Sequence, residues 1–417
     1  MTIPADAWTV REAERTDAWD WLAFLLGVFF ILVYSQGWIA PIFGVKLDEA
    51  SSGMIRNAYL PAYAAGIVLL AMAPGATLAA LLRQPFLLAL LGIVALSTLW
   101  SIAPDQTIRR IVAVYATTLC GVVLATRFRW STMAEVLATA NAVLVIGSIA
   151  WAVLPPHNGI MTELFPGAWR GLWVEKNALG GNMATAFTVF AAAALLAPRR
   201  RVLWWIFAGL ALALVLLSTS KTSLVSLILG AGAVGFVWVA RRGPVSGVAA
   251  TWAAVLGALL MAAFLLFASD VFLELLGKDA TLTGRTKIWD AALRQAELRP
   301  WTGYGYSAVW DDKSGWGPLA WITKEAGFKA SHAHNAWIEQ WLGLGIAGVI
   351  AWGLFYLQTM GAAIASVFGR AGAYLALPFL VIFSLLTLTE SIAVTYHDIR
   401  WSIFVALAVK LSWPGRE

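Results

Sequence analysis

The chain has 417 residues, of which 60% are hydrophobic and 12% are charged, and its mean hydropathy is +0.76. A soluble globular protein carries about 25% charged residues, so this composition excludes a soluble enzyme, a disordered chain and a nucleic-acid-binding protein. The one cysteine, Cys120, excludes a disulfide framework, a cysteine-based zinc site and an iron–sulfur centre. The remaining class is a polytopic membrane protein, in which the positions of Lys and Arg matter more than the net charge of +6.

Twelve apolar runs predict an all-α membrane protein, because a helix needs roughly 20 apolar residues to cross the hydrocarbon of a bilayer. We expect a polytopic fold with about 12 transmembrane helices and one large periplasmic loop. The polar residues 1–19 precede a run that lacks a small-residue cleavage site, so we expect no cleaved signal peptide. The runs are 20–41, 57–74, 86–102, 108–126, 133–154, 179–197, 202–219, 222–240, 247–269, 336–359, 371–390 and 399–414.

The distribution of Lys and Arg predicts that both termini face the cytoplasm. With that orientation, the inside segments hold thirteen basic residues and the short outside loops hold eight. We expect residues 1–417 to form a single integral membrane domain, with segment 270–335 as a periplasmic loop that carries part of an active site. All four histidines then lie outside, whereas the inside connections are too short for a nucleotide-binding domain. Chemistry is therefore expected on the outer face.

Two histidines lie where the long loop enters the tenth run, in the segment His332-Ala-His334-Asn335. A histidine at the mouth of a helix bundle can act as a general base near neutral pH, or it can simply form a hydrogen bond at the interface. The pair also suggests a metal ion, but neither a cysteine nor an adjacent carboxylate completes a ligand set. We therefore expect no metal and no other cofactor.

Four cationic residues are candidates for binding an anion. Arg285 follows a glycine at the start of a predicted helix, where backbone N–H groups and a guanidinium together suit a phosphate or pyrophosphate. Arg170, Lys176 and Lys221 lie at outside helix ends. Lys221 has long apolar runs on both sides, and a charge near membrane depth usually faces a cavity or a partner, although it can also snorkel to the surface. If these cations converge, they form a site for a lipid pyrophosphate or phosphate.

Acidic and aromatic residues give weaker signals. Glu390 ends the eleventh run, where it can pair with one of the cations or hold an acceptor hydroxyl. The segment 301–306, Trp-Thr-Gly-Tyr-Gly-Tyr, suits either a sugar ring or the membrane interface. The pair Asp48–Glu49 in the first outside loop resembles the acidic residues of metal-dependent lipid-sugar transferases, but it is followed by Ala-Ser-Ser-Gly and looks like an ordinary loop.

These segments, in this order, resemble the O-antigen ligase and polymerase superfamily, which contains the WaaL ligases and the Wzy polymerases. The most specific match is a histidine followed by Asn, Ser or Gln, nine residues, Gly, two residues, and Gly, Thr or Tyr. Here the motif is His334-Asn335, nine residues, Gly345, two residues and Gly348. Further segments match the family's Arg-Gly…Lys-Asn, Ser-(Arg/Lys)-Thr and loop-arginine patterns, and they are Arg170-Gly171 with Lys176-Asn177, Ser220-Lys221-Thr222, and Thr283-Gly284-Arg285.

The resemblance covers about residues 160–400, and the Lys-Asn segment with Glu390 looks closest to the exopolysaccharide polymerase branch typified by ExoQ. It implies a GT-C-like glycosyltransferase of the bacterial inner membrane, inverting and metal-independent, with its active site facing the periplasm. The implied donor is a glycan on undecaprenyl pyrophosphate, and the implied acceptor is a hydroxyl of a second glycan. His334 would deprotonate or orient that hydroxyl. Arg285 and the other cations would bind the pyrophosphate, with His332, Asn335 and Glu390 also in contact with substrate.

Three alternative functions are consistent with the sequence. A polymerase would join one lipid-linked repeat unit to another, whereas an O-antigen ligase would transfer the glycan to the lipid A core. A transporter or flippase of a lipid-linked glycan would also need outward cations, but it would predict internal repeats and charges near the middle of the membrane. Membrane lipids, a chain-length regulator and export proteins are the further partners considered.

Overall fold

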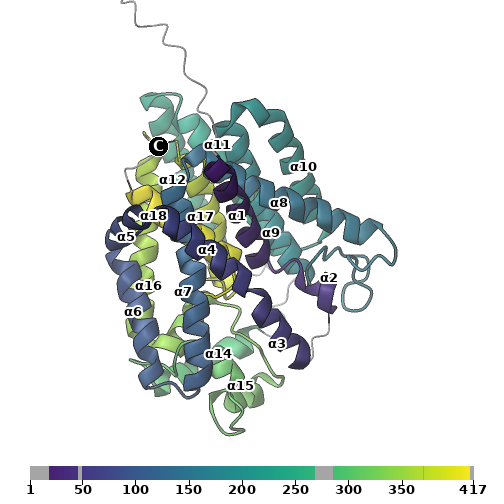
Figure 1. Ribbon diagram of the computed structural model, residues 1–417, viewed down its shortest axis with the longest axis vertical. Coiled ribbons are helices and arrows are strands. Elements are labelled where there is room, and N and C mark those ends of the chain that lie inside the picture. The colour runs from purple at the N-terminus through teal and green to yellow at the C-terminus, as the bar shows by residue number, and fades with distance from the viewer. Residues whose placement is uncertain (1–17, 46–48, 268–284, 370, 414–417) are drawn as a thin grey trace, which may run out of the picture.

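The computed structural model describes residues 18–45, 49–267, 285–369 and 371–413 (Figure 1). Over these ranges the secondary structure is helical, apart from one isolated bridge between Ile160 and Trp169, so the all-α prediction is confirmed for them. Of the predicted acidic pair, Asp48 and the side chain of Glu49 lie outside the described part. The first helices are α1 (Ala18–Tyr34), α2 (Ile39–Phe43), α3 (Glu49–Ala58), α4 (Leu60–Met72), α5 (Pro74–Leu82), α6 (Pro85–Leu96), η2 (Ser97–Leu99), α7 (Pro104–Arg127) and α8 (Trp130–Val153). The others are α9 (Lys176–Leu196), η3 (Pro198–Arg200), α10 (Arg201–Leu217), α11 (Lys221–Ala240), α12 (Pro244–Phe267), α14 (Arg285–Leu298), η5 (Val309–Asp311), α15 (Pro318–Ala326), α16 (Ala336–Ser366), α17 (Ala373–Thr389) and α18 (Ile399–Ser412).

Eight helices in the described part of the chain are long and apolar enough to cross a membrane, or nine if one bent pair counts as a single span. The chain is therefore a multi-pass membrane protein. Each of the twelve predicted runs overlaps a helix, but α1 and α17 have 17 residues each and α18 has 14. The bent pair, Pro74–Leu82 and Pro85–Leu99, meets at 90°, since a residue that precedes a proline is disfavoured in a helix. The count of twelve spans stays a prediction.

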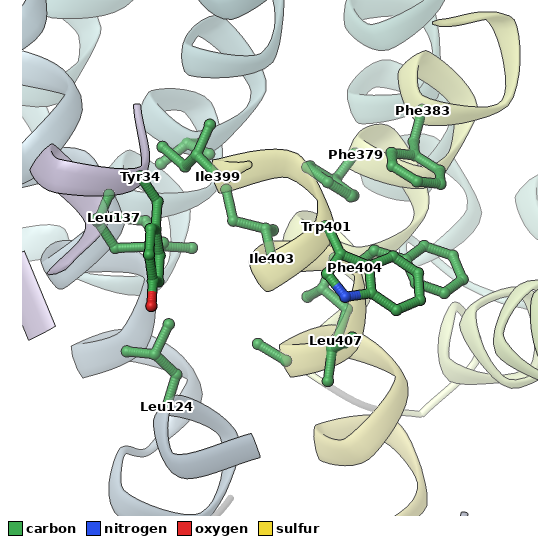
Figure 2. Packing of buried hydrophobic residues seen from close by; sticks show 14 of the residues in the cluster. Tyr34, Leu124, Leu137, Phe379, Phe383, Ile399, Trp401, Ile403, Phe404 and Leu407 are labelled. Atoms are coloured by element: carbon green, nitrogen blue, oxygen red, sulfur yellow. The ribbon is translucent and has the colours of Figure 1, made fainter. Parts of the chain in front are cut away.

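The shortest of these helices, α18, forms the centre of the bundle. Its residues from Trp401 to Leu411 are all buried, as expected for a helix that is apolar on every side except at Ser402 and Lys410. Figure 2 shows Ile399 and Ile403 facing Tyr34 of α1, while Trp401 and Phe404 face Phe379 and Phe383 of α17. The rings of Phe383 and Phe404 stack with centroids 4.8 Å apart. Because α18 is held from both sides, the loop that precedes it, residues 390–398, is anchored in the core.

Helices α14 and α15 cover one end of the bundle (Figure 1). They share a small hydrophobic core with the first turns of α16, built from Ile288, Ala292, Ile322, Ile338 and Leu342. The segment that joins them to the preceding helix lies outside the described residues. Burial of these apolar side chains means that residues 285–335 form an ordered cap on the bundle, within the segment that was expected to be a loop.

A break in α16 receives this cap. Gly345 has φ 68°, a conformation that favours glycine, and a Cβ there would overlap the backbone of Trp301. Around the break the backbone of Ile346 donates to Pro300 O at 2.7 Å, and that of Tyr304 donates to Leu342 O at 3.0 Å. The first glycine of the histidine motif therefore opens the helix so that segment 300–305 can dock against it.

Candidate active site

Two cavities lie side by side at the capped end of the bundle. Their volumes are about 560 Å³ and about 640 Å³, within the range of about 300–1,000 Å³ that is usual for small-molecule sites. The first is called the polar cavity here and the second the cationic cavity. Four residues line both cavities: Gln36, His332, Glu390 and Arg400. These residues form the shared wall.

Strained backbone gathers around the same place. Seven non-glycine residues in the described chain have positive φ, and five of them line one or both cavities: Gln36, Thr219, Ser307, His334 and Val394. Val394 is β-branched, so its φ of 52° is a genuine outlier. Such conformations cost on the order of 1–3 kcal/mol each, and they cluster at functional sites, where the surrounding structure holds them in place.

The cationic cavity contains Lys176 and Lys221, which begin helices α9 and α11. The two helix starts are tied together, because Ser220 Oγ donates to Asn177 Oδ1 at 2.9 Å and Lys176 Nζ donates to Thr219 Oγ1 at 3.2 Å. Within the described residues, neither lysine has an ion-pair partner. The positive ends of two long helices and two ammonium groups without an ion-pair partner among the described residues therefore face one cavity, which favours an anion.

A chain of polar contacts joins three segments that are far apart in the sequence. The Arg285 guanidinium donates to Glu390 Oε1 at 3.0 Å and to Thr389 O at 2.5 Å. The other oxygen of Glu390, Oε2, lies 3.2 Å from His334 Nδ1. All three side chains line the cationic cavity. The predicted base and the predicted loop arginine thus meet through the carboxylate that ends α17.

The Glu390 carboxylate fixes the tautomer of His334. Burial alone would raise the pKa of Glu390, but the hydrogen bond with His334 and the positive charge of Arg285 outweigh burial and hold it at about 2. An ionised carboxylate can only accept hydrogen bonds, so Nδ1 of His334 carries the proton. In the neutral ring Nε2 is then left with a lone pair, which is the arrangement that a general base needs.

His332 lies next to this chain, with its ring centroid 3.8 Å from that of His334. Burial is the main cause that lowers its pKa to about 4, and the neighbouring His334 contributes to that shift. Sequence reasoning found no carboxylate near the two histidines, but the fold brings Glu390 to them: one ligand atom from each of the three lies within 4.8 Å of the others. These residues could hold a metal ion, yet Arg285 occupies the second carboxylate oxygen and repels a cation. The expectation of no metal stays a prediction.

Two of the predicted residues lie elsewhere. Asn335 caps α16, since its Oδ1 accepts from the backbone N–H groups of Trp337 and Ile338 at 2.9 and 3.2 Å. It lines neither cavity. An asparagine at this position of the motif is explained by the start of the helix, because Asn is a favoured N-cap residue. Arg170 donates to Asn158 O at 2.8 Å and also lines neither cavity. The structure does not bring it together with the other cations.

Sequence reasoning missed a carboxylate that holds the site in place. Glu339 Oε1 accepts from the backbone N–H of Ala333, at 2.6 Å, and from Ser391 Oγ, at 2.9 Å. Its Oε2 accepts from Trp310 Nε1 at 2.8 Å. Glu339 thereby links the histidine segment to the residue that follows Glu390. Its position one helical turn after the N-cap Asn335 was the only signal in the sequence.

Sequence reasoning also missed Arg400, which lines both cavities. Asp398 caps α18 and holds the Arg400 guanidinium at 2.5 Å. The same loop contains His397, whose backbone oxygen accepts from Gln36 Nε2 at 2.8 Å. Gln36 and Arg400 are thus set in the shared wall by the segment that α18 anchors.

The fold and the site together describe a multi-pass membrane protein in which a cavity lined by cationic side chains lies beside a histidine–carboxylate pair. A family described as O-antigen ligase matches residues 206–353, which include Lys221, Arg285 and the histidine motif. The exopolysaccharide production protein ExoQ of Rhizobium meliloti (strain 1021) is 29% identical to the chain over 269 residues, covering 60% of this chain and 58% of ExoQ. These matches confirm the resemblance to the O-antigen ligase and polymerase superfamily and to its ExoQ-like branch. The chain spans a little under three fifths of the length of this relative.

Proposed function

We propose that this protein is a glycosyltransferase that moves a glycan from undecaprenyl pyrophosphate to a hydroxyl of a second glycan at the periplasmic face of the inner membrane. The observation that carries the proposal is the chain Arg285–Glu390–His334 on the wall of a cavity that also holds Lys176 and Lys221. It combines a base with a site for an anionic leaving group. The resemblance to O-antigen ligases and to ExoQ supports the same reaction class.

The cationic cavity suits the donor. Transfer breaks the bond between the anomeric carbon and the pyrophosphate oxygen, so negative charge builds up on the departing lipid pyrophosphate. Lys176, Lys221 and Arg285 are placed to stabilise that charge, and groups arranged in advance around a developing charge are usually the largest source of catalysis. Apolar residues on the same walls, such as Ile39 and Leu386, suit the start of the polyprenyl chain.

His334 serves the acceptor. As the acceptor oxygen bonds to the anomeric carbon, its proton moves to Nε2 of His334, while Glu390 stabilises the charge that appears on the ring. Attack from the face opposite the pyrophosphate inverts the anomeric centre. The pyrophosphate can leave without being protonated, and a single displacement forms no covalent intermediate with the enzyme. One base and a set of cations are therefore enough for the transfer. A base in this role contributes about 10²–10⁴-fold to the rate.

We further propose that the acceptor is a second lipid-linked repeat unit, which makes the protein a polymerase. The likeness to an exopolysaccharide production protein supports this choice over an O-antigen ligase. The test uses purified protein in nanodiscs with undecaprenyl-pyrophosphate-linked repeat units, and products are resolved on a gel. A ladder of longer lipid-linked glycans is expected from the wild type and from His157→Ala, a histidine that lines neither cavity, but not from His334→Ala.

Other outcomes reject parts of the proposal. Product that appears only after a lipid A core is added would make the protein a ligase. No glycosidic product with either acceptor, together with movement of intact lipid-linked glycan across a sealed vesicle, would make it a transporter.

A further inference from the structure

The polar cavity differs from the cationic cavity in its charge. The cationic cavity is lined by four cationic side chains, Lys176, Lys221, Arg285 and Arg400, and two anionic ones, Glu175 and Glu390. The polar cavity is lined by three of each sign: Arg110, Lys329 and Arg400 against Asp311, Glu339 and Glu390. A pyrophosphate is therefore favoured in the first cavity, whereas the second gives no net attraction to an anion.

Most charges in the polar cavity are also already paired. Arg110 forms an ion pair with Asp311 and donates to Ser307 O, which holds the 307–311 segment against α7. Glu339 is occupied by three donors, as described above. What these walls offer to a ligand is aromatic and neutral polar surface, including Tyr306, Trp310 and Tyr396. Such a surface suits an uncharged, hydroxyl-rich molecule.

One buried group in this cavity lacks a partner. Gln340 is 4% exposed, and its Nε2 donates to Ala393 O at 3.2 Å, which fixes the orientation of the amide. Its Oε1 is buried and has no hydrogen-bond partner among the described residues. A buried acceptor without a donor costs about 1–3 kcal/mol, so such groups in native proteins call for an explanation. Because Gln340 lines the polar cavity, a ligand hydroxyl there can satisfy it.

We infer that the polar cavity is the acceptor subsite, in which the non-reducing end of a glycan binds and donates a hydroxyl hydrogen bond to Gln340 Oε1. This inference rests on the proposed glycosyltransferase function. The two substrates would then approach the shared wall from opposite sides, with the lipid pyrophosphate at Lys176 and Lys221 and the sugar at Gln340 and Trp310. The reacting groups meet at His332, His334 and Glu390. Gln340 binds the acceptor sugar through this hydrogen bond and takes no part in bond breaking.

The experiment separates the two subsites by substitution. Gln340→Leu removes the amide with little change of volume, Lys221→Met removes one unpaired cation, and Gln358→Leu on the same helix is the matched control, since Gln358 lines neither cavity. Two probes are titrated into each protein in nanodiscs: undecaprenyl pyrophosphate without a glycan, and the repeat-unit oligosaccharide released from its lipid by mild acid. Transfer from the lipid-linked donor to the soluble oligosaccharide is measured in parallel.

For Gln340→Leu we expect the KM and the Kd for the oligosaccharide to rise by about two- to twelvefold, the effect of one uncharged hydrogen bond. Its affinity for undecaprenyl pyrophosphate should stay within twofold of the wild type. Lys221→Met should show the opposite pattern, and Gln358→Leu should show neither change.

Two results would overturn the inference: equal losses of both affinities in Gln340→Leu, or no loss of either. The binding measurements do not need transfer, so they decide between the subsites even if the wild type forms no glycosidic bond. Failure of transfer in the wild type would count against the proposed function alone.

Discussion

Replacing Glu390 by glutamine tests the proton arrangement of the site. The amide is nearly isosteric with the carboxylate, and its oxygen can still accept from Arg285. The amide nitrogen then faces His334 Nδ1 and donates to it, whereas the wild-type carboxylate accepts from it at 3.2 Å. The proton of a neutral imidazole is thereby forced onto Nε2, and the lone pair that should receive the acceptor's proton is lost.

The magnitude follows from what each contact supplies. A general base is worth about 10²–10⁴-fold in rate, so kcat should fall by that factor. The KM for the lipid-linked donor should stay the same or decrease, because Arg285 keeps its charge and is no longer neutralised. The free energy of unfolding should fall by only about 1 kcal/mol, because both hydrogen bonds remain and only the negative charge of their acceptor is lost.

The assay is the rate of glycan transfer at varied donor concentration, with Tm of each protein measured in the same nanodiscs. Glu325→Gln is the matched control, since Glu325 pairs with Arg294 at 2.9 Å on the surface and lines neither cavity. Exposed pairs contribute about 0–1 kcal/mol, so this variant should resemble the wild type. A kcat for Glu390→Gln within about tenfold of the wild type would refute the role of His334 as a base and leave it only an orienting role.

Three further predictions concern the helix break, acid stability and metals. Gly345→Ala should lower Tm and activity, because a Cβ would overlap the backbone of Trp301. The control Gly361→Ala, on the same helix, meets open space and should be neutral or stabilising. Equal Tm values for the two variants would contradict the docking of segment 300–305. His397 stacks on Tyr59 and burial lowers its pKa from 6.5 to about 3; the unfolded chain therefore takes up the proton first, and stability is lost as the pH falls from about 6.5 towards 3. In His397→Phe the difference in Tm between pH 7.5 and pH 5 should accordingly shrink, and an unchanged difference would assign the acid sensitivity to other groups. Transfer should persist in excess EDTA, and a loss that added divalent metal restores would place an ion at the two histidines and the carboxylate.

The helices could be predicted from the sequence because they depend on local composition. Each of the twelve apolar runs overlaps a helix, and the helix starts at Lys176 and Lys221 coincide with short polar motifs. The apolar runs could not predict which helices lie inside the bundle. The 14 residues of α18 read as an ordinary span, yet all of them except Arg400 and Ser412 are buried. The 90° turn after α5 was also outside the reach of hydropathy, although Pro85 marks the place.

Some residues of the candidate site could be predicted from motifs, but their arrangement in space could not. His334 and Arg285 could be proposed from their motifs, whereas their meeting depends on Glu390, which is 56 residues from the histidine and 105 from the arginine. Such contacts are set by the packing of α17 and α18, which no short motif encodes. The same packing positions Arg400 in the wall of both cavities, whereas Arg170 lies on a loop outside them.

The most direct test of whether His334 and its partners carry out a group transfer is a ratio. It compares the undecaprenyl pyrophosphate released with the glycosidic bonds formed. Purified wild-type protein and His334→Ala would be given the same lipid-linked repeat unit, and both products would be quantified in one reaction. We expect one undecaprenyl pyrophosphate per new bond in the wild type and in His157→Ala, and neither product from a stably inserted His334→Ala. Equal release and bond formation by His334→Ala, or no release by the wild type, would contradict the proposal.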